Sequence, residues 1–141
     1  MSMLKERIEI NQPMAEVWKY LDLRRWPKIS KIFQQVETPD EAMQAGARFK
    51  VIAGPGEATV QYNVEIVAYD ESLGRLVYKR TGGHLPGTSE WSLTKTAGGT
   101  RVEYTNHYDH DLASPVLSSL SRAMVRFLAD LRAAIEKPSA A

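Results

Sequence analysis

Arg80 is the residue whose type and position most directly suggest chemistry, because it shares its alternation with Leu76 and Tyr78 in one predicted strand. In that register the guanidinium points into the protein. A buried guanidinium needs a carboxylate, carbonyl oxygens or a ligand oxygen, and it can hold a carboxylate or enolate by two parallel hydrogen bonds. Gly82-Gly83 follows, so the alternative is a strand end from which Arg80 reaches solvent or pairs with an acid. Glu6, the only acid of inward parity, is either a candidate partner for Arg80 or a sign that the register of its strand is shifted.

The histidines offer weaker chemistry. His84, in the glycine- and proline-bounded segment 82–87, is either an acid or base at a cavity mouth or a solvated loop histidine. With Arg80 and Tyr78 it completes the set of candidate catalytic residues. His107 and His110 fall on opposite faces of a strand, so we predict no metal site. The chain has no cysteine and no phosphate-loop, nucleophile-elbow or zinc-protease motif, and we expect no cofactor.

Alternation of apolar and polar residues predicts the strands that position these side chains. The longest run extends from Ala58 to Ala68, after a turn at Gly54-Pro55-Gly56. Shorter runs lie at 4–10, around Val36, and at 48–53, 76–80, 89–93 and 102–108. One apolar and one polar face is typical of an antiparallel sheet with one wet side.

Helical spacing predicts two short helices and one long one. The first short helix begins at Pro13, capped by Asn11 or Gln12, and the second covers Arg24 to Ile32 with Pro27 in its first turn. The long helix has Ser114 as N-cap, Pro115 as its first residue and an apolar stripe that continues to Ile135. A flexible tail is expected from about residue 138.

A sheet with one apolar face and a helix with one apolar stripe can bury both by packing together. The predicted fold is therefore α+β, a curved antiparallel sheet of about seven strands around the C-terminal helix. We expect a cavity between them. Parity predicts this inward-facing, ligand-binding set: Phe49, Val51, Val60, Tyr62, Val64, Tyr78, Arg80, Trp91, Leu93, Tyr104, Asn106, Tyr108, Met124, Phe127, Leu128 and Leu131. The alternative is that aromatic residues simply favour sheets and that Asn106 satisfies strand-end backbone.

Several segments, in this order, resemble the START-like superfamily with the helix-grip fold, the SRPBCC group that includes polyketide cyclase/dehydrase-like proteins. They are Ile8-x-Ile10-x-x-Pro13-x-x-x-Val17-Trp18-x-x-Leu21-Asp22, Trp26-Pro27, Glu90-Trp91-Ser92-Leu93, Gly98-Gly99-Thr100-Arg101-Val102 and the leucine-rich helix from Pro115. The resemblance covers nearly the whole chain. It implies a hydrophobic cavity between the sheet and the last helix, and it does not select among the superfamily's carriers, binders and cyclases.

Composition limits the partners. The 141 residues are expected to form one domain over 1–141, and 18 Lys+Arg against 17 Asp+Glu argue against a nucleic-acid-binding protein. The chain has no segment with the pattern of a signal peptide and no membrane-spanning apolar run, so we expect a cytoplasmic protein.

Four cations cluster beside Trp26: Arg24, Arg25, Lys28 and Lys31. They form either a solvated face or a contact with an anionic membrane surface or nucleic-acid phosphates.

Three functions remain open. The leading one is binding, with transport as an extension, of a hydrophobic or aromatic molecule such as a lipid, quinone or polyketide, oriented by Arg80, Tyr62, Tyr78, Tyr104 and Asn106. The second is a cofactor-independent cyclase or dehydratase in which Arg80 and a tyrosine stabilise an enolate while His84 moves protons. The third is an interaction module with a filled core, and no pattern specifies an oligomeric state.

Overall fold

The computed structural model describes residues 1–39, 42–54, 59–83 and 85–137. The elements, in chain order, are β1 (Ser2–Ile10), α1 (Met14–Trp18), the 3-10 turn η1 (Leu23–Arg25), α2 (Trp26–Ile29), β2 (Phe33–Glu37), β3 (Arg48–Ala53), β4 (Val60–Asp70), β5 (Arg75–Thr81), β6 (Gly87–Thr96), β7 (Gly99–Tyr108) and α3 (Ser114–Glu136). The predicted turn at Pro55-Gly56, Ala58, His84 and the tail from 138 lie outside the described residues.

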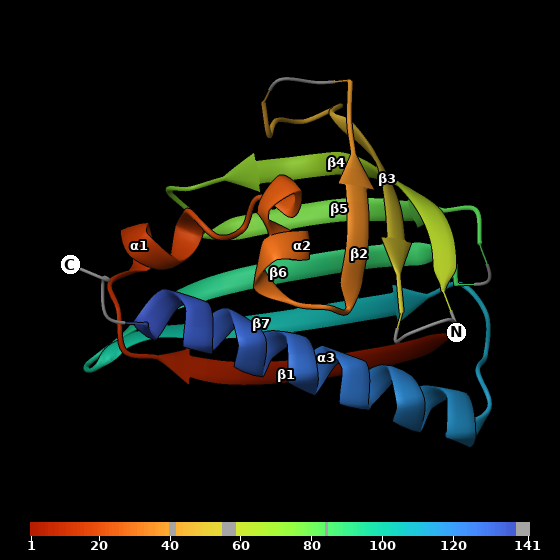
Figure 1. Cartoon of the computed structure of the whole chain (residues 1–141). Helices are drawn as coiled ribbons and strands as arrows, with labels where there is room; N and C mark the ends of the chain where they lie inside the picture. Colours follow the sequence, from red (N-terminus) through yellow and green to blue (C-terminus); the bar gives the residue numbers. More distant parts are fainter. Residues whose placement is uncertain (40–41, 55–58, 84, 138–141) are drawn as a thin grey trace.

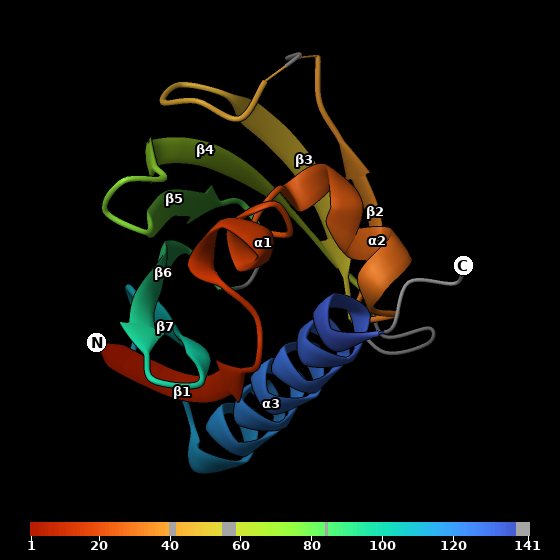
Figure 2. The same ribbon diagram turned by 90° about the vertical axis from the view of Figure 1, so that its left-hand side faces the viewer.

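The strands form one antiparallel sheet of seven strands in the order β1-β7-β6-β5-β4-β3-β2. The sheet curves, so that α3 lies along its open side next to β1, with α1 and α2 on the same concave face (Figures 1 and 2). This is the α+β helix-grip arrangement that the alternating strands and the striped helix predict. No helix among the described residues is long and apolar enough to cross a bilayer.

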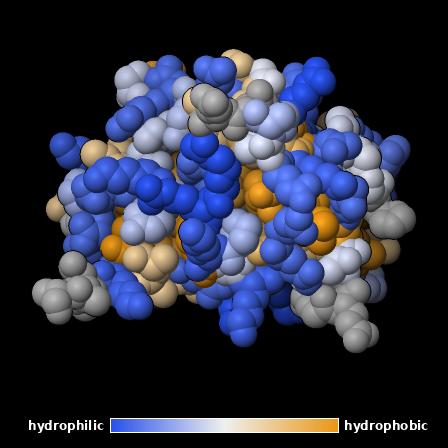
Figure 3. All heavy atoms as spheres, turned by 45° about the horizontal axis from the view of Figure 1, so that its top comes forward, coloured by the Kyte–Doolittle hydropathy of each residue, from blue (hydrophilic) through white to orange (hydrophobic). Residues whose placement is uncertain are grey.

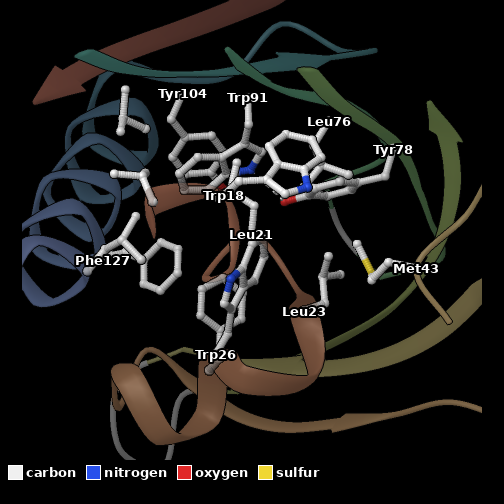
Figure 4. Close-up of a cluster of buried hydrophobic side chains, with 14 of the residues drawn as sticks. Trp18, Leu21, Leu23, Trp26, Met43, Leu76, Tyr78, Trp91, Tyr104 and Phe127 are labelled. Carbon is white, nitrogen blue, oxygen red and sulfur yellow. Dashed lines mark hydrogen bonds between the residues drawn. The ribbon is translucent and has the colours of Figure 1, made fainter. Parts of the chain in front are cut away.

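An aromatic cluster fills the part of the concave face beneath α2. The Trp26 ring centroid lies 5.1 Å from that of Phe127 and 5.5 Å from that of Trp91, and the Trp26 indole donates to the carbonyl of Tyr20 at 2.9 Å. The labelled side chains converge from the three helices, from η1 and the loops, and from the sheet (Figure 4). Trp26 therefore anchors α2 in the core.

On the outside, hydrophilic residues cover most of the face seen in Figure 3, with apolar atoms in small patches between them.

The long alternation in β4 ends at a bulge. The pairing of β4 with β5 shifts between Ile66 and Ala68, so the intervening Val67 is an extra residue and is 46% exposed. Inserting one residue reverses the parity that follows. Tyr69, expected on the outer face, consequently packs on Trp18 with ring centroids 4.7 Å apart. The prediction that one parity holds up to Ala68 was wrong for this reason.

The predicted helix boundaries need three corrections. Pro13 is the N-cap of α1 rather than its first residue, because its backbone is extended and its carbonyl accepts from Val17 N at 3.2 Å. Ala113, not Ser114, is the N-cap of α3, since its carbonyl already accepts from Leu117 N. The second helix divides into η1 and α2 and ends at Ile29, although Pro27 does lie in the first turn of α2.

Candidate ligand-binding cavity

A cavity of about 320 Å³ lies between the concave face of the sheet and the first half of α3. Its walls come from the segment after α2, from β3 to β7 and from one face of α3. The lining residues are Ile32, Phe33, Ala53, Gly54, Val60, Tyr62, Arg80, Leu85, Tyr104, Asn106, Tyr108, Ser119, Leu120, Ala123, Met124 and Phe127. Small residues on two walls, such as Ala53 and Ala123, leave the space that larger side chains would fill.

Half of the predicted inward set lines this cavity: Val60, Tyr62, Arg80, Tyr104, Asn106, Tyr108, Met124 and Phe127. The other half is buried away from the lining: Phe49, Val51, Val64, Tyr78, Trp91, Leu93, Leu128 and Leu131. Parity indicates the face of a strand, but it does not say which stretch of that face the Trp26 cluster covers. These eight residues therefore pack in the solid core.

Eight lining residues were missed from the sequence: Ile32, Phe33, Ala53, Gly54, Leu85, Ser119, Leu120 and Ala123. Three of them had a usable signal, because Ser119, Leu120 and Ala123 follow the helical spacing that leads to Met124 and Phe127. Leu85 had none, since it lies in the loop before β6 with no periodic pattern around it.

Arg80 lies on the inner face with only 8% of its surface exposed. Its Nη1 donates to the carbonyl of Leu85 and its Nη2 to the carbonyl of His107, each at 2.5 Å. The Nε of Arg80 has no hydrogen-bond partner among the described residues. Glu6 is not its partner: that carboxylate accepts from Ser121 Oγ of α3 at 2.9 Å. Arg80 is thus buried against carbonyls with one donor unsatisfied.

Gly87 makes the reach of Arg80 possible. In the sheet register Arg80 pairs with Gly87 on β6, and Gly87 pairs with Tyr108 on β7. A Cβ atom on Gly87 would collide with the carbonyl of His107 and would lie 2.8 Å from Nη2 of Arg80. The missing side chain lets the guanidinium cross β6 and stack on the Tyr108 ring, 4.7 Å from its centroid.

Three tyrosines and Asn106 surround this end of the cavity. Burial raises the pKa values of Tyr62, Tyr104 and Tyr108 above the usual tyrosine value, so their hydroxyls stay protonated near neutral pH. Asn106 accepts from Ser89 Oγ at 2.5 Å. Tyr62 has no hydrogen-bond partner among the described residues, and part of its ring borders the cavity. Protonated phenols act here as hydrogen-bond donors rather than bases.

The remaining candidates for chemistry lie elsewhere. Tyr78 is fully covered by the core, where the Trp91 indole lies 3.5 Å from its hydroxyl and burial raises its pKa to about 12. His107 projects from the outer face of β7, and His110 is exposed after it. Among the described lining residues none carries a carboxylate or an imidazole, and no described group of His, Asp or Glu side chains could hold a metal ion.

The family model for polyketide cyclase/dehydrase and lipid transport proteins matches residues 1–136. The chain belongs to this family. Its members share a hydrophobic-ligand-binding fold, which agrees with the apolar cavity. No curated protein matches the chain significantly by sequence.

Solved structures similar to this family member have the same fold. TTHA0849 from Thermus thermophilus superposes with a TM-score of 0.83 at 18% identity, covering 98% of this chain and 99% of that one. The Zhui aromatase/cyclase from Streptomyces sp. R1128 gives 0.82 at 13% identity, covering 96% and 94%. Ara h 8.0201 gives 0.76 at 21% identity, covering 95% and 97%. At these identities the likeness establishes the fold alone.

The basic segment of this polyketide cyclase/dehydrase-type chain divides into two parts. Arg24 binds Asp22 through Nε at 2.9 Å and Nη2 at 2.6 Å, and Arg25 lies over the Tyr20 ring. Lys28 and Lys31 are exposed, and neither has an ion pair among the described residues. Lys28 and Lys31 therefore present charge that no carboxylate neutralises, and Arg25 likewise has only its ring contact.

Proposed function

We propose that the protein binds a hydrophobic or aromatic small molecule, of the lipid, quinone or polyketide type, in the cavity between the sheet and α3. The observation that carries this proposal is the combination of an apolar cavity with Tyr62, Arg80 and Asn106 at one end. The Tyr62 hydroxyl has no partner among the described residues, and a ligand oxygen placed there would accept a hydrogen bond from it. Pockets that hold small molecules usually combine apolar walls with a few polar groups in this way.

The size of the cavity favours a compact ligand. About 320 Å³ is near the lower end of the range of roughly 300–1,000 Å³ typical of ligand pockets. One or two fused rings, or a single short acyl chain, fit this space better than a two-chain lipid. Phe33, Tyr104 and Phe127 on the walls add ring surfaces against which an aromatic ligand can stack.

The polar end favours a ligand that carries an oxygen, and above all an anionic one. Arg80 brings a positive charge, and Tyr62 brings a hydroxyl that has no hydrogen-bond partner among the described residues. Hydrogen bonds to an ionised acceptor are roughly twice as strong as neutral ones. A carboxylate, phenolate or enolate oxygen at this end would therefore orient the ligand, with its apolar part toward Phe127.

Tryptophan fluorescence tests the proposal, since Trp91 stacks on Tyr104 of the cavity wall at 3.9 Å between ring centroids. We expect naphthalene-2-carboxylate to quench the emission saturably, 2-naphthol to bind less tightly and naphthalene more weakly still. Ala123→Phe fills the cavity from α3 and should abolish the change. Ala129→Phe, on the exposed side of the same helix, is the matched control. Saturable binding that survives Ala123→Phe would place the ligand elsewhere.

A second candidate function is a cofactor-independent cyclase, favoured by one observation: Arg80 and the unpartnered Tyr62 hydroxyl are donors at the same end of the cavity. They would stabilise an enolate whose carbon attacks a ketone carbonyl of the same polyketide chain, after which water is lost. His84, adjacent to the lining residue Leu85, is the remaining candidate for proton transfer.

Mass spectrometry of the products separates the two functions. Incubation with a poly-β-ketone thioester mimic should yield a dehydrated ring faster than the uncatalysed reaction if the protein is a cyclase. His84→Ala should then slow turnover without changing ligand affinity. Unchanged mimic together with tight binding would leave binding as the function. The third alternative, an interaction module, required a filled core, and the cavity argues against it.

A further inference from the structure

We propose that the cavity mouth docks on an anionic membrane surface through four cations, Lys28, Lys31, Arg122 and Arg126, here named the basic rim. The proposal rests on the proposed function, because it concerns how a hydrophobic ligand reaches the cavity. Of the basic cluster in the sequence it keeps Lys28 and Lys31, and it adds two arginines from α3.

The basic rim lies beside part of the cavity lining. Ile32, which follows α2, and Ser119 and Ala123 in the first half of α3 line the cavity and are exposed or half-buried. Lys31 directly precedes Ile32, and Arg122 directly precedes Ala123. Figure 2 shows α2 close to α3 on this side of the molecule.

One hydrogen-bond network holds the two halves of the basic rim together. Ser30, only 4% exposed, donates from Oγ to Asp130 Oδ2 at 2.6 Å, and Arg126 Nε donates to the other oxygen of Asp130 at 3.2 Å. This ties the end of α2 to α3. Arg122 lies four residues before Arg126, so both project from the same side of the helix. Cations from two distant segments therefore share one surface.

The charge of this surface is strongly one-sided. Segments 28–33 and 119–130 contain four cations and one carboxylate, Asp130, both of whose oxygens are engaged, and the Glu6 carboxylate of β1 reaches α3 at Ser121. Lys28, Lys31 and Arg122 are exposed and form no ion pair among the described residues. Since the whole chain carries a net charge of only +1, the positive potential is local. An anionic bilayer is complementary to it.

A bilayer suits this surface better than an acidic protein does. Lys28 and Lys31 have flexible side chains that bind anionic headgroups without fixed geometry. Half-buried Ile29 and Ile32 each directly follow one of the lysines and add apolar surface next to the interface. A hydrophobic ligand concentrates in the membrane. A cavity mouth held against the bilayer therefore shortens the distance that the ligand travels through water to the cavity.

Vesicle co-sedimentation tests the proposal. The wild-type protein should bind vesicles of phosphatidylcholine with phosphatidylglycerol, more weakly as salt rises, and should not bind phosphatidylcholine alone. The variant Lys28→Glu/Lys31→Glu/Arg122→Glu should lose more than about a hundredfold in partitioning, at roughly fivefold or more for each charge. The control Lys50→Glu/Lys79→Glu/Lys95→Glu makes the same net change at exposed strand positions away from α2 and α3 and should stay within a few-fold.

Equal losses in the two triple variants would overturn the proposal, because net charge alone would then explain binding. So would rim-dependent binding of polyglutamate without binding of vesicles, which would indicate an acidic protein partner. The naphthalene-2-carboxylate titration of the rim variant should be unchanged, which shows that the cavity is intact. Vesicle binding by a wild-type protein that takes up no ligand would instead reject the proposed function and retain the docking surface.

Discussion

The Arg80 guanidinium and the Tyr108 ring stack 4.7 Å apart across an intervening strand. The contact spans β6 at Gly87, where no side chain stands between the two. The charged end of the cavity therefore depends on the missing side chain of Gly87 and on two side chains, Arg80 and Tyr108, that lie 28 positions apart in the chain.

Replacing Arg80 should separate its structural and ligand-binding contributions. Arg80→Met leaves the carbonyls of Leu85 and His107 without their donor and should lower the free energy of unfolding by about 1–3 kcal/mol. It should also weaken binding of naphthalene-2-carboxylate while leaving naphthalene unchanged. Urea denaturation and fluorescence titration measure the two effects. Equal weakening for both ligands would contradict a specific contact with an anionic oxygen.

Gly87 should not tolerate even one added methyl group. Gly87→Ala places Cβ against the His107 carbonyl and Arg80 Nη2, so we expect a loss of about 1–3 kcal/mol or more in unfolding free energy. Gly98→Ala is the matched control, because a Cβ there meets nothing within 4 Å, and its effect should stay within about 0.5 kcal/mol. Similar stabilities for the two variants would contradict the close packing at Gly87.

The buried tyrosines should make the fold sensitive to alkali. Burial raises the pKa of Tyr78 to about 12 in the folded protein, whereas it is about 10 in the unfolded chain. The folded state therefore keeps its proton when the unfolded state loses it, so stability is full below pH 10 and falls as the pH rises toward 12. The expected slope is about 1.4 kcal/mol per pH unit for each such tyrosine.

Urea denaturation between pH 8 and pH 11 measures this slope. Tyr78→Phe should reduce the slope of stability against pH. In the native protein, tyrosinate absorbance of the buried residues should appear only at a higher pH than that of exposed tyrosines. A stability that is constant up to pH 11 would contradict the assignment of Tyr78 to the dry core.

Phe127 belongs to both the core and the cavity wall. It packs against Trp26, Phe33 and Trp91, with ring centroids 4.7–5.7 Å away, and is 1% exposed. Phe127→Ala should cost about 3–5 kcal/mol of unfolding free energy and enlarge the cavity. We therefore expect a three-ring ligand such as anthracene-2-carboxylate to gain affinity relative to naphthalene-2-carboxylate. An unchanged ratio of the two dissociation constants would mean that Phe127 does not limit ligand size.

Alternation predicts the inner face of each strand as long as the register is regular. It places Tyr62, Arg80 and Tyr104 correctly on the inner face because no bulge occurs between each of them and its neighbours of the same parity. It fails beyond Val67, where an inserted residue reverses the faces and brings Tyr69 onto Trp18. A bulge depends on pairing with the neighbouring strand, and that pairing leaves no mark in a local pattern.

The sequence does not predict which inward-facing residues pack in the core and which line the cavity. Trp91 and Tyr104 have the same parity and stack on each other, but only Tyr104 lines the cavity. What separates them is the position of Trp26, which enters from a short helix far away in the chain. Likewise, the network of Ser30, Asp130 and Arg126 joins residues about a hundred positions apart and has no periodic signal.

The most direct test of the account is native mass spectrometry of the protein as purified, alongside Ala123→Phe, followed by organic extraction. We predict a wild-type adduct with the mass of one compact, oxygen-bearing hydrophobic molecule, absent from the variant. A bare wild-type mass, with no shift in melting temperature across lipids, quinones and aromatic acids, would contradict the claim that this cavity binds a ligand.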